Sequence, residues 1–217
     1  MLGVIFTGGE SPDSLTISKL IKTEAPQSAL LIAADSGFEA AYGAGLKPDW
    51  VIGDMDSIAD PKQLESLPPE RIIRAQRDKD FTDTEMAVSL AAEKGCDDFW
   101  IIGGGGGRID HLFGIRSLFE RDIFPLRWIT DSADIRCINA GTESRARVCC
   151  ELEAGAVVSV FPLGDGTWEA KSEGLKWALN GLSWDRGFFG LSNIAVDGKF
   201  SIMAEKGRFM VVLPKEI

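Results

Sequence analysis

The sequence predicts an α/β protein in two parts, a mostly parallel α/β domain over residues 1–128 and an all-β sandwich over residues 129–217. Strand-like and helix-like segments alternate through the first half, which is typical of a parallel sheet covered by helices. Near residue 125 this alternation gives way to short β-like segments separated by Gly, Asp and Asn turns, which is typical of a sandwich. The length of 217 residues allows one large domain and a smaller one, at about 150 residues per domain.

Helix and strand signals alternate along the first part of the chain. Apolar runs that end at glycine or polar residues predict strands at residues 2–6, 29–34, 50–52, 71–74 and 99–102. Apolar residues at helical spacing predict helices at residues 14–23, 38–44, 82–94 and 109–121. The helix at 82–94 has the clearest beginning, because Thr82 is a suitable N-cap and Glu85 stands three residues later, as in a capping box.

The second part reads as a series of short β-like segments. They cover residues 126–130, 135–139, 144–150, 157–162, 167–172, 194–196, 199–203 and 208–213. Asp197-Gly198 lies between two of them and predicts a hairpin turn, because this dipeptide favours the backbone conformation of a tight turn. Regular short strands without helices predict a sandwich or barrel, and we place the change between the two parts around residues 120–135.

Charge and hydropathy exclude several classes of protein. The net charge of −10 and the pI of about 4.7 would repel a nucleic-acid backbone, so we expect no nucleic-acid partner. No apolar run reaches the roughly 18 residues of a membrane span, so no membrane partner is expected. Residues 1–14 lack the basic and apolar regions of a signal peptide, which makes a cytoplasmic location the expectation.

Cysteine and histidine usage restricts the chemistry. The four cysteines, Cys96, Cys137, Cys149 and Cys150, show no CxxC spacing, so we expect reduced thiols in a reducing compartment rather than a zinc site. His111 is the single histidine of the chain, and this excludes metal sites with several histidine ligands. A hydrolase of the Ser/His/Asp type would have to depend on this one residue.

Acidic side chains gather after the third predicted strand and at the start of the next predicted helix. Asp54 and Asp56 stand two residues apart in the first place, and Asp80 and Asp83 stand in the second. Ligands of open parallel sheets bind at the carboxyl ends of the strands, so these loops are expected to meet at one edge. Mg²⁺ is usually held by a few carboxylates and substrate phosphates, so the four acids predict a Mg²⁺–phosphate site. In the structural alternative, Asp54 and Asp56 form Asx-turns and Asp83 favours a helix N-terminus.

A glycine run connects the last predicted strand of the first part to the helix after it. Residues 103–107 are all glycine, and Arg108 and Asp110-His111 follow. Glycines let backbone N–H groups approach an anion, the helix N-terminus favours negative charge, and Arg108 offers a forked donor for phosphate. The run lacks the Gly-Lys-Ser/Thr of a Walker A loop. The alternatives are a tight turn for the glycines and a helix-cap hydrogen bond for His111.

The second part carries a polar dipeptide after an aromatic, glycine-rich stretch. The dipeptide is Ser192-Asn193, and the aromatic residues before it are Trp177, Trp184, Phe188 and Phe189. Aromatic faces beside a few polar groups suit a flat heterocycle, especially a cationic one. The alternative is that these rings pack within the sandwich core and its hairpins.

Five motifs in a common order resemble the thiamine pyrophosphokinase (thiamine diphosphokinase) family, and the resemblance covers residues 3–213. The motifs are Asp35-Ser36-Gly37; Lys47-Pro48-Asp49 with Gly53-Asp54-Met55-Asp56-Ser57; Lys79-Asp80-Phe81-Thr82-Asp83-Thr84-Glu85; Gly106-Gly107-Arg108-Ile109-Asp110-His111; and Ser192-Asn193. The resemblance implies an α/β domain that binds ATP and Mg²⁺ and a β-sandwich that binds thiamine. It also implies a homodimer with each active site between the α/β domain of one subunit and the β domain of the other. The implied reaction transfers pyrophosphate from ATP to the hydroxyl group of thiamine, giving AMP and thiamine diphosphate.

The resemblance also implies roles for individual residues. Asp54, Asp56 and Asp83 resemble the Mg²⁺ ligands, and Asp35 and Asp80 resemble carboxylates that orient the substrate, with Asp80 a candidate acceptor of the hydroxyl proton. The nucleotide-binding loop corresponds to Arg108, Asp110 and His111, and the thiamine pocket to Ser192 and Asn193.

Three other functions are consistent with the same residues. The scaffold could transfer pyrophosphate to a different alcohol. The acidic loops could serve a Mg²⁺-dependent phosphohydrolase, although no D-x-D-x-[TV] nucleophile motif follows the first predicted strand. The chain could also bind a nucleotide or thiamine without catalysis, which would predict a missing metal acid, whereas all four acids are present.

Overall fold

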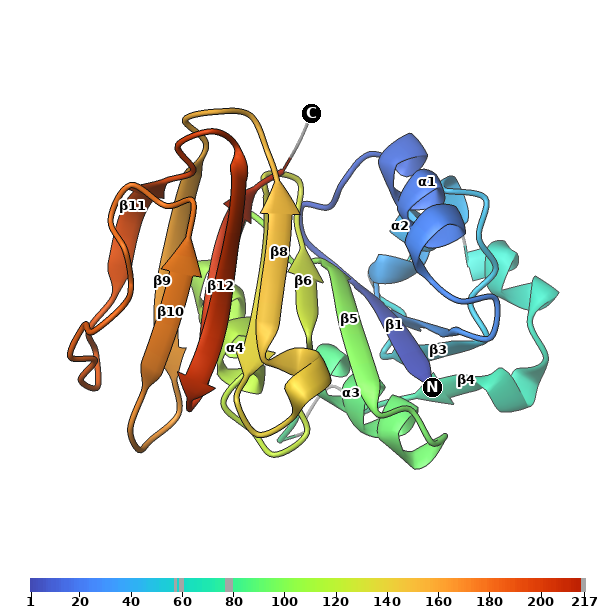
Figure 1. The fold of residues 1–217 in the computed structure, drawn as a ribbon. Helices are drawn as coiled ribbons and strands as arrows, with labels where there is room; N and C mark the ends of the chain where they lie inside the picture. The colour runs from blue at the N-terminus through green and yellow to red at the C-terminus, as the bar shows by residue number, and fades with distance from the viewer. Residues whose placement is uncertain (57, 59–60, 77–79, 216–217) are drawn as a thin grey trace. The chain divides into compact units, whose positions relative to one another are not determined.

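The structure, a computed structural model, describes residues 1–56, 58, 61–76 and 80–215 of the chain (Figure 1). The chain forms two compact units. The first unit contains Met1–Leu118 and Ile123–Ser132, and the second contains Phe119–Asp122 and Ala133–Ile217. Within the described residues, no helix is both long and apolar enough to cross a membrane.

The first unit is built on a parallel sheet with the strand order β6-β5-β1-β2-β3-β4. The strands are β1 (Leu2–Thr7), β2 (Leu30–Ala34), β3 (Trp50–Gly53), β4 (Ile72–Arg74), β5 (Asp98–Gly103) and β6 (Arg127–Ile129). The helices are α1 (Ser14–Glu24), α2 (Gly37–Gly43), α3 (Asp83–Glu93) and α4 (Ile109–Leu118), with short 3₁₀ turns η1 (Pro61–Ser66) and η2 (Pro69–Arg71). This is the parallel α/β architecture that the alternating signals predicted.

Helices cover both faces of this sheet, which explains why β1 is buried along its whole length. Val4 and Phe6 lie in one core cluster with Ile17 of α1. On the opposite face, a Cβ atom placed on Gly3 would lie 3.0 Å from Cβ of Ala91 in α3. Since β1 is the strand between β2 and β5, its carboxyl end lies in the middle of the sheet edge, where the predicted site residues gather.

The second unit is a β-sandwich, as predicted. One antiparallel layer has the order β11-β9-β13-β7, and the other has the order β10-β12-β8. Its elements are β7 (Ala133–Asn139), η3 (Glu143–Arg145), β8 (Arg147–Glu151), β9 (Val157–Leu163), β10 (Glu169–Glu173), β11 (Gly190–Ile194), β12 (Lys199–Lys206) and β13 (Arg208–Pro214). Val160 of β9, Ile202 of β12 and Phe209 of β13 belong to one buried cluster, so alternating apolar residues of both layers form a common core.

Two predictions about the second part were wrong. The segment predicted at 126–130 contains β6, which pairs in parallel with β5 and belongs to the first unit, because the chain returns to the sheet after α4. Asp197-Gly198 does not join two paired strands: β11 pairs with β9, whereas β12 pairs with β10 and β8. A Cβ atom on Gly198 would overlap the carbonyl oxygen of Leu152, so this glycine permits a close crossing of the chain between layers.

Three predicted element boundaries also differ. The helix predicted at 109–121 ends at Leu118, and the chain then enters turns. The segment predicted at 144–150 begins with η3, and its strand starts at Arg147. The strand predicted at 194–196 lies earlier, at Gly190–Ile194, and so contains the Ser192-Asn193 dipeptide itself.

Candidate functional site

Glycines allow the loops that follow neighbouring strands to touch at the carboxyl edge of the parallel sheet. A Cβ atom on Gly8, after β1, would overlap Oγ of Ser36, which follows β2. A Cβ atom on Gly53, the last residue of β3, would lie 3.2 Å from Cα of Asp35. The loops after β1, β2 and β3 therefore meet, as expected for strand ends of a parallel sheet.

Three carboxylates converge at this edge. One oxygen of each of Asp35, Asp54 and Asp56 lies within 4.8 Å of the others, and we call these residues the acidic cluster. Oδ1 of Asp35 is buried and has no hydrogen-bond partner in the described part of the chain. Clustered carboxylates repel one another unless a cation lies between them, and hard oxygen donors suit Mg²⁺. The donor set and the buried, unpaired oxygen therefore fit a divalent cation.

The backbone is turned unusually at two positions of this site. Asp35 and Met55 have φ angles of 49° and 64°, in the left-handed region that non-glycine residues seldom adopt. Met55 is buried in a core cluster with Ala33 and Val51, so it anchors the loop between the two aspartates. Such backbone conformations persist where the surrounding structure enforces them, and they are enriched at functional sites.

The predicted Asx-turn also exists. The backbone N–H of Asp56 donates to Oδ1 of Asp54 at 3.2 Å. This bond orients the Asp54 carboxylate and is compatible with membership of the acidic cluster. The structural and the metal-binding interpretations of these two acids are therefore not exclusive.

The acids at the start of α3 stand apart from that cluster. Thr82 caps the helix: its hydroxyl accepts from the N–H of Glu85 at 3.2 Å, and its own N–H donates to the Glu85 carboxylate at 2.7 Å. Asp83 is the first residue of the helix and is half-buried, and Asp80 is exposed just before it. Among the described residues, the acidic cluster includes neither, so a metal role for Asp83 and a catalytic role for Asp80 stay predictions.

The glycine run forms one wall of a cavity of about 490 Å³ in the first unit. Its lining comes from the loop after β1, the start of α3 and the segment from the glycine run into α4: Thr7, Gly8, Gly9, Thr82, Thr84, 104–108, Asp110, His111, Gly114, Ile115 and Leu118. Gly105 exchanges two backbone hydrogen bonds with Glu10, of 2.7 and 2.8 Å, which holds the run against the first loop. Gly104 has a φ of 72°, and a side chain there would overlap Ile115. The positive φ favours glycine at this position, and any side chain there would also displace the end of the Ile115 side chain.

Arg108 and Asp110 form an exposed ion pair at the rim of this cavity. Nε and Nη2 of Arg108 donate to the two oxygens of Asp110 at 3.1 and 2.5 Å. The guanidinium holds the pKa of the Asp110 carboxyl below its usual range, and the carboxylate raises the pKa of Arg108. An exposed pair of this kind contributes little to stability, so Arg108 can exchange this partner for a phosphate at small cost. His111 is exposed next to it and lines the same cavity.

In the second unit, the side-chain amide of Asn193 forms hydrogen bonds within the protein. It is 5% exposed; its Nδ2 donates to the carbonyl oxygen of Trp177 at 2.6 Å, and its Oδ1 accepts from the N–H of Trp177 at 3.1 Å. These bonds fix the backbone of Trp177, a residue that is 54% exposed, and the ammonium group of Lys176 lies 4.7 Å from the centroid of its ring. Asn193 therefore positions Trp177, whose face already accepts a cation. The sequence offers no signal for this pairing, because it joins residues 16 apart through the backbone of one of them.

Ser192 and the remaining aromatic residues of this stretch differ in exposure and packing. Ser192 is exposed, with a φ of 59°, and its N–H donates to Oγ of Ser159 at 3.2 Å. Trp184 is buried and packs edge-on against Phe209 of the core, which is the packing alternative. Phe188 and Phe189 are exposed. Of the motif residues, Ser57 and Lys79 lie outside the described residues.

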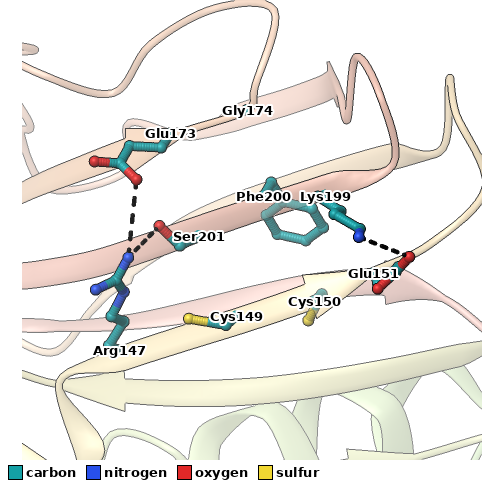
Figure 2. A pocket seen from close by; sticks show the side chains of 9 residues that line it. All are labelled: Arg147, Cys149, Cys150, Glu151, Glu173, Gly174, Lys199, Phe200 and Ser201. Carbon is teal, nitrogen blue, oxygen red and sulfur yellow. Dashed lines mark hydrogen bonds and ion pairs between the residues drawn. The ribbon is translucent and has the colours of Figure 1, made fainter.

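A second depression, of about 470 Å³, lies on the outer face of the sheet formed by β10, β12 and β8 (Figure 2). Its charged side chains pair with one another: Arg147 contacts Ser201 at 2.9 Å and Glu173 at 3.9 Å, and Lys199 contacts Glu151 at 3.3 Å. Open, exposed ion pairs are typical of a solvated sheet face. We assign no site to this depression.

Comparisons with known proteins agree with the motifs. The family model described as thiamin pyrophosphokinase, catalytic domain, matches residues 21–123. The thiamine pyrophosphokinase of Bacillus subtilis (strain 168) is 29% identical over 156 residues, which cover 70% of this chain and 71% of the relative.

Solved structures show the same fold. The thiamine pyrophosphokinase of Bacillus subtilis superimposes with a TM-score of 0.77 at 25% identity, over 100% of both chains. The thiamin pyrophosphokinase of Geobacillus thermodenitrificans gives 0.71 at 21% identity, over 100% of this chain and 98% of the other. The Candida albicans enzyme gives 0.68 at 15% identity, over 99% and 89%, and at such identities the likeness speaks for the fold alone.

Proposed function

We propose that this chain, which belongs to the thiamine pyrophosphokinase family, transfers a pyrophosphoryl group from ATP to the hydroxyl group of thiamine. The products are thiamine diphosphate and AMP. The observation that supports this proposal most strongly is the acidic cluster, in which a buried and unpaired oxygen of Asp35 meets the carboxylates of Asp54 and Asp56 at the carboxyl edge of the sheet.

Asp54 and Asp56 are proposed to hold Mg²⁺ together with Asp83. Asp35 is a further candidate ligand, because one of its oxygens lies within 4.8 Å of those of Asp54 and Asp56. A bound Mg²⁺ supplies positive charge that neutralises the phosphate oxygens of ATP. The hardness and number of the oxygen donors are those that Mg²⁺ takes when substrate phosphates complete its coordination.

The glycine-lined cavity is proposed to hold the ATP phosphates. Arg108 at its rim offers forked donors, His111 lies beside it, and Asp110 keeps the guanidinium oriented until a phosphate arrives. The thiamine hydroxyl then attacks the β-phosphorus in line with the departing AMP, and positioning lowers most of the barrier. Asp80, exposed before α3, is the proposed acceptor of the hydroxyl proton.

Thiamine is proposed to bind at the second unit beside Ser192 and the exposed face of Trp177. That face already attracts the Lys176 ammonium group, so it suits a cationic heterocycle. Asn193 contributes by holding the backbone of Trp177.

We further propose a homodimer with each active site shared between subunits. The free cysteines support a reducing, cytoplasmic location.

An AMP-release assay tests the function. The protein is incubated with ATP and Mg²⁺, with and without thiamine, and the product is identified by mass. The proposal predicts thiamine-dependent AMP and a product with the mass of thiamine diphosphate. Asp54→Asn should abolish turnover, and Asp197→Asn, which makes the same charge change in an exposed turn of the second unit, should not. AMP release without thiamine would indicate hydrolysis and overturn the proposal.

A further inference from the structure

Two buried hydroxyl groups meet where β1 and α3 line the glycine-lined cavity. Thr7 is the last residue of β1, and Thr84 is the second residue of α3. Their Oγ1 atoms lie 2.6 Å apart, although the residues are separated by 77 positions in the sequence. The two residues are 7% and 8% exposed, and both line the cavity.

One hydrogen of this pair has no acceptor. Each hydroxyl carries one hydrogen and accepts through its lone pairs, so the bond between the two hydroxyls uses one of two hydrogens. Neither side chain makes another hydrogen bond within the described part of the chain. A buried donor without an acceptor is unfavourable, unless a ligand or a water molecule in the cavity accepts it.

The glycine run packs directly against Thr7 and leaves the pair at the cavity surface. A Cβ atom on Gly104 would lie 3.2 Å from Cγ2 of Thr7, and one on Gly103 would overlap the Thr7 carbonyl oxygen. Both threonines belong to the lining of the cavity, and these two positions of the run add no side chain in front of them. A ligand in the cavity can therefore approach the pair closely.

We propose that the Thr7–Thr84 pair donates its remaining hydroxyl hydrogen to a phosphate oxygen of the nucleotide. This inference rests on the proposed function, which places the ATP phosphates in the cavity. Hydrogen bonds to charged groups are stronger than neutral ones, and loss of this one should weaken ATP binding by about 10- to 100-fold. A purely structural pair would instead tie β1 to α3 without affecting the bound nucleotide directly.

Single and double valine variants separate these two roles. Thr84→Val leaves the Thr7 hydroxyl buried without its partner, so stability should fall, whereas the Thr7 hydrogen remains available to a phosphate oxygen. Thr7→Val/Thr84→Val removes both hydroxyl groups, so its unfolding temperature should recover toward wild type while its affinity for Mg²⁺-ATP falls by about 10- to 100-fold. Thr84→Ser retains the hydroxyl and should bind as wild type does. Ser172→Ala, which removes a buried hydroxyl of the second unit, is the matched control.

The experiment measures thermal unfolding and the dissociation constant of Mg²⁺-ATP by calorimetry on the full chain. Wild-type affinity in the double variant would overturn the inference, because the pair would then act only as a structural tie. If Thr84→Val fails to fold, the double variant alone decides, since it leaves no unpaired hydroxyl. A wild-type protein that does not bind ATP would refute the proposed function and this inference together. Binding by the wild type with no loss in the double variant refutes only the inference.

Discussion

Replacement of Asp35 by asparagine should stabilise the metal-free protein while weakening its response to Mg²⁺. The substitution removes one charge from the acidic cluster and keeps the shape of the side chain. Asparagine also tolerates the left-handed backbone conformation of this position, where φ is 49°, so little backbone strain is added. The new amide group could donate a hydrogen bond to a neighbouring carboxylate, which the aspartate cannot do.

The magnitude follows from the spacing of the carboxylates. Two unit charges 4.8 Å apart repel by about 0.9 kcal/mol in a water-like dielectric, and more if the site is drier. Asp35 faces two such neighbours, so the gain in unfolding free energy is about 2 kcal/mol. For a chain of this size, that corresponds to a rise of about 4–8 °C in Tm.

The assay is thermal unfolding in a chelator and then at increasing Mg²⁺ concentrations. The wild type should gain about 2.7 kcal/mol at a Mg²⁺ concentration about 100 times its dissociation constant, and Asp35→Asn should gain clearly less at that concentration. Asp197→Asn controls for the change in net charge. If Asp35→Asn unfolds in the chelator at the same temperature as this control, the acidic cluster carries no repulsion and the reasoning fails. An unchanged Mg²⁺ response would exclude Asp35 as a ligand.

Three other predictions concern separate parts of the molecule. Asp83→Asn should lower kcat by about a hundredfold or more in steady-state assays, with a stability change below about 1 kcal/mol from the helix terminus; wild-type kcat would remove Asp83 from the metal site. Ser192→Ala should raise the KM of thiamine by about 2- to 10-fold and leave the KM of ATP unchanged. If both KM values stay unchanged, Ser192 does not belong to the thiamine pocket. Burial raises the pKa of the Cys137 thiol to about 12, so the unfolding free energy should fall between pH 9 and pH 12, because the unfolded thiol loses its proton first. The contribution of Cys137 to the slope is at most about 1.4 kcal/mol per pH unit, so the slope should be shallower in Cys137→Ala than in the wild type and unchanged in Cys149→Ala. Denaturant titrations across this pH range measure it, and equal slopes in Cys137→Ala and the wild type would contradict the burial argument.

Local signals predicted most of the fold because they act within a few residues. Apolar runs ending at glycine marked β1 and β5, and the spacing of Thr82 and Glu85 marked the capping box that starts α3. The errors are non-local. A three-residue strand such as β6 has the same apolar pattern whether it pairs in parallel or antiparallel. Only its pairing with β5 shows that it belongs to the first unit.

The same distinction applies to the site. The two-residue spacing of Asp54 and Asp56 sufficed to predict that their carboxylates lie close together. The inclusion of Asp35 in their cluster depends on the pairing of β2 with β3 and on its left-handed backbone, and neither can be recognised from a short motif. The Asn193 amide is bonded to the Trp177 backbone, and a dipeptide motif does not reveal that partner.

The central claim is that the chain moves two phosphoryl groups from ATP to thiamine as one unit. Radioactive label at the γ-phosphate of ATP tests it directly, with the products separated by chromatography. The account predicts that the label appears in thiamine diphosphate, that unlabelled AMP forms in equal amount, and that no ADP forms. Label recovered as thiamine monophosphate with ADP, or as free phosphate without any thiamine product, would contradict it.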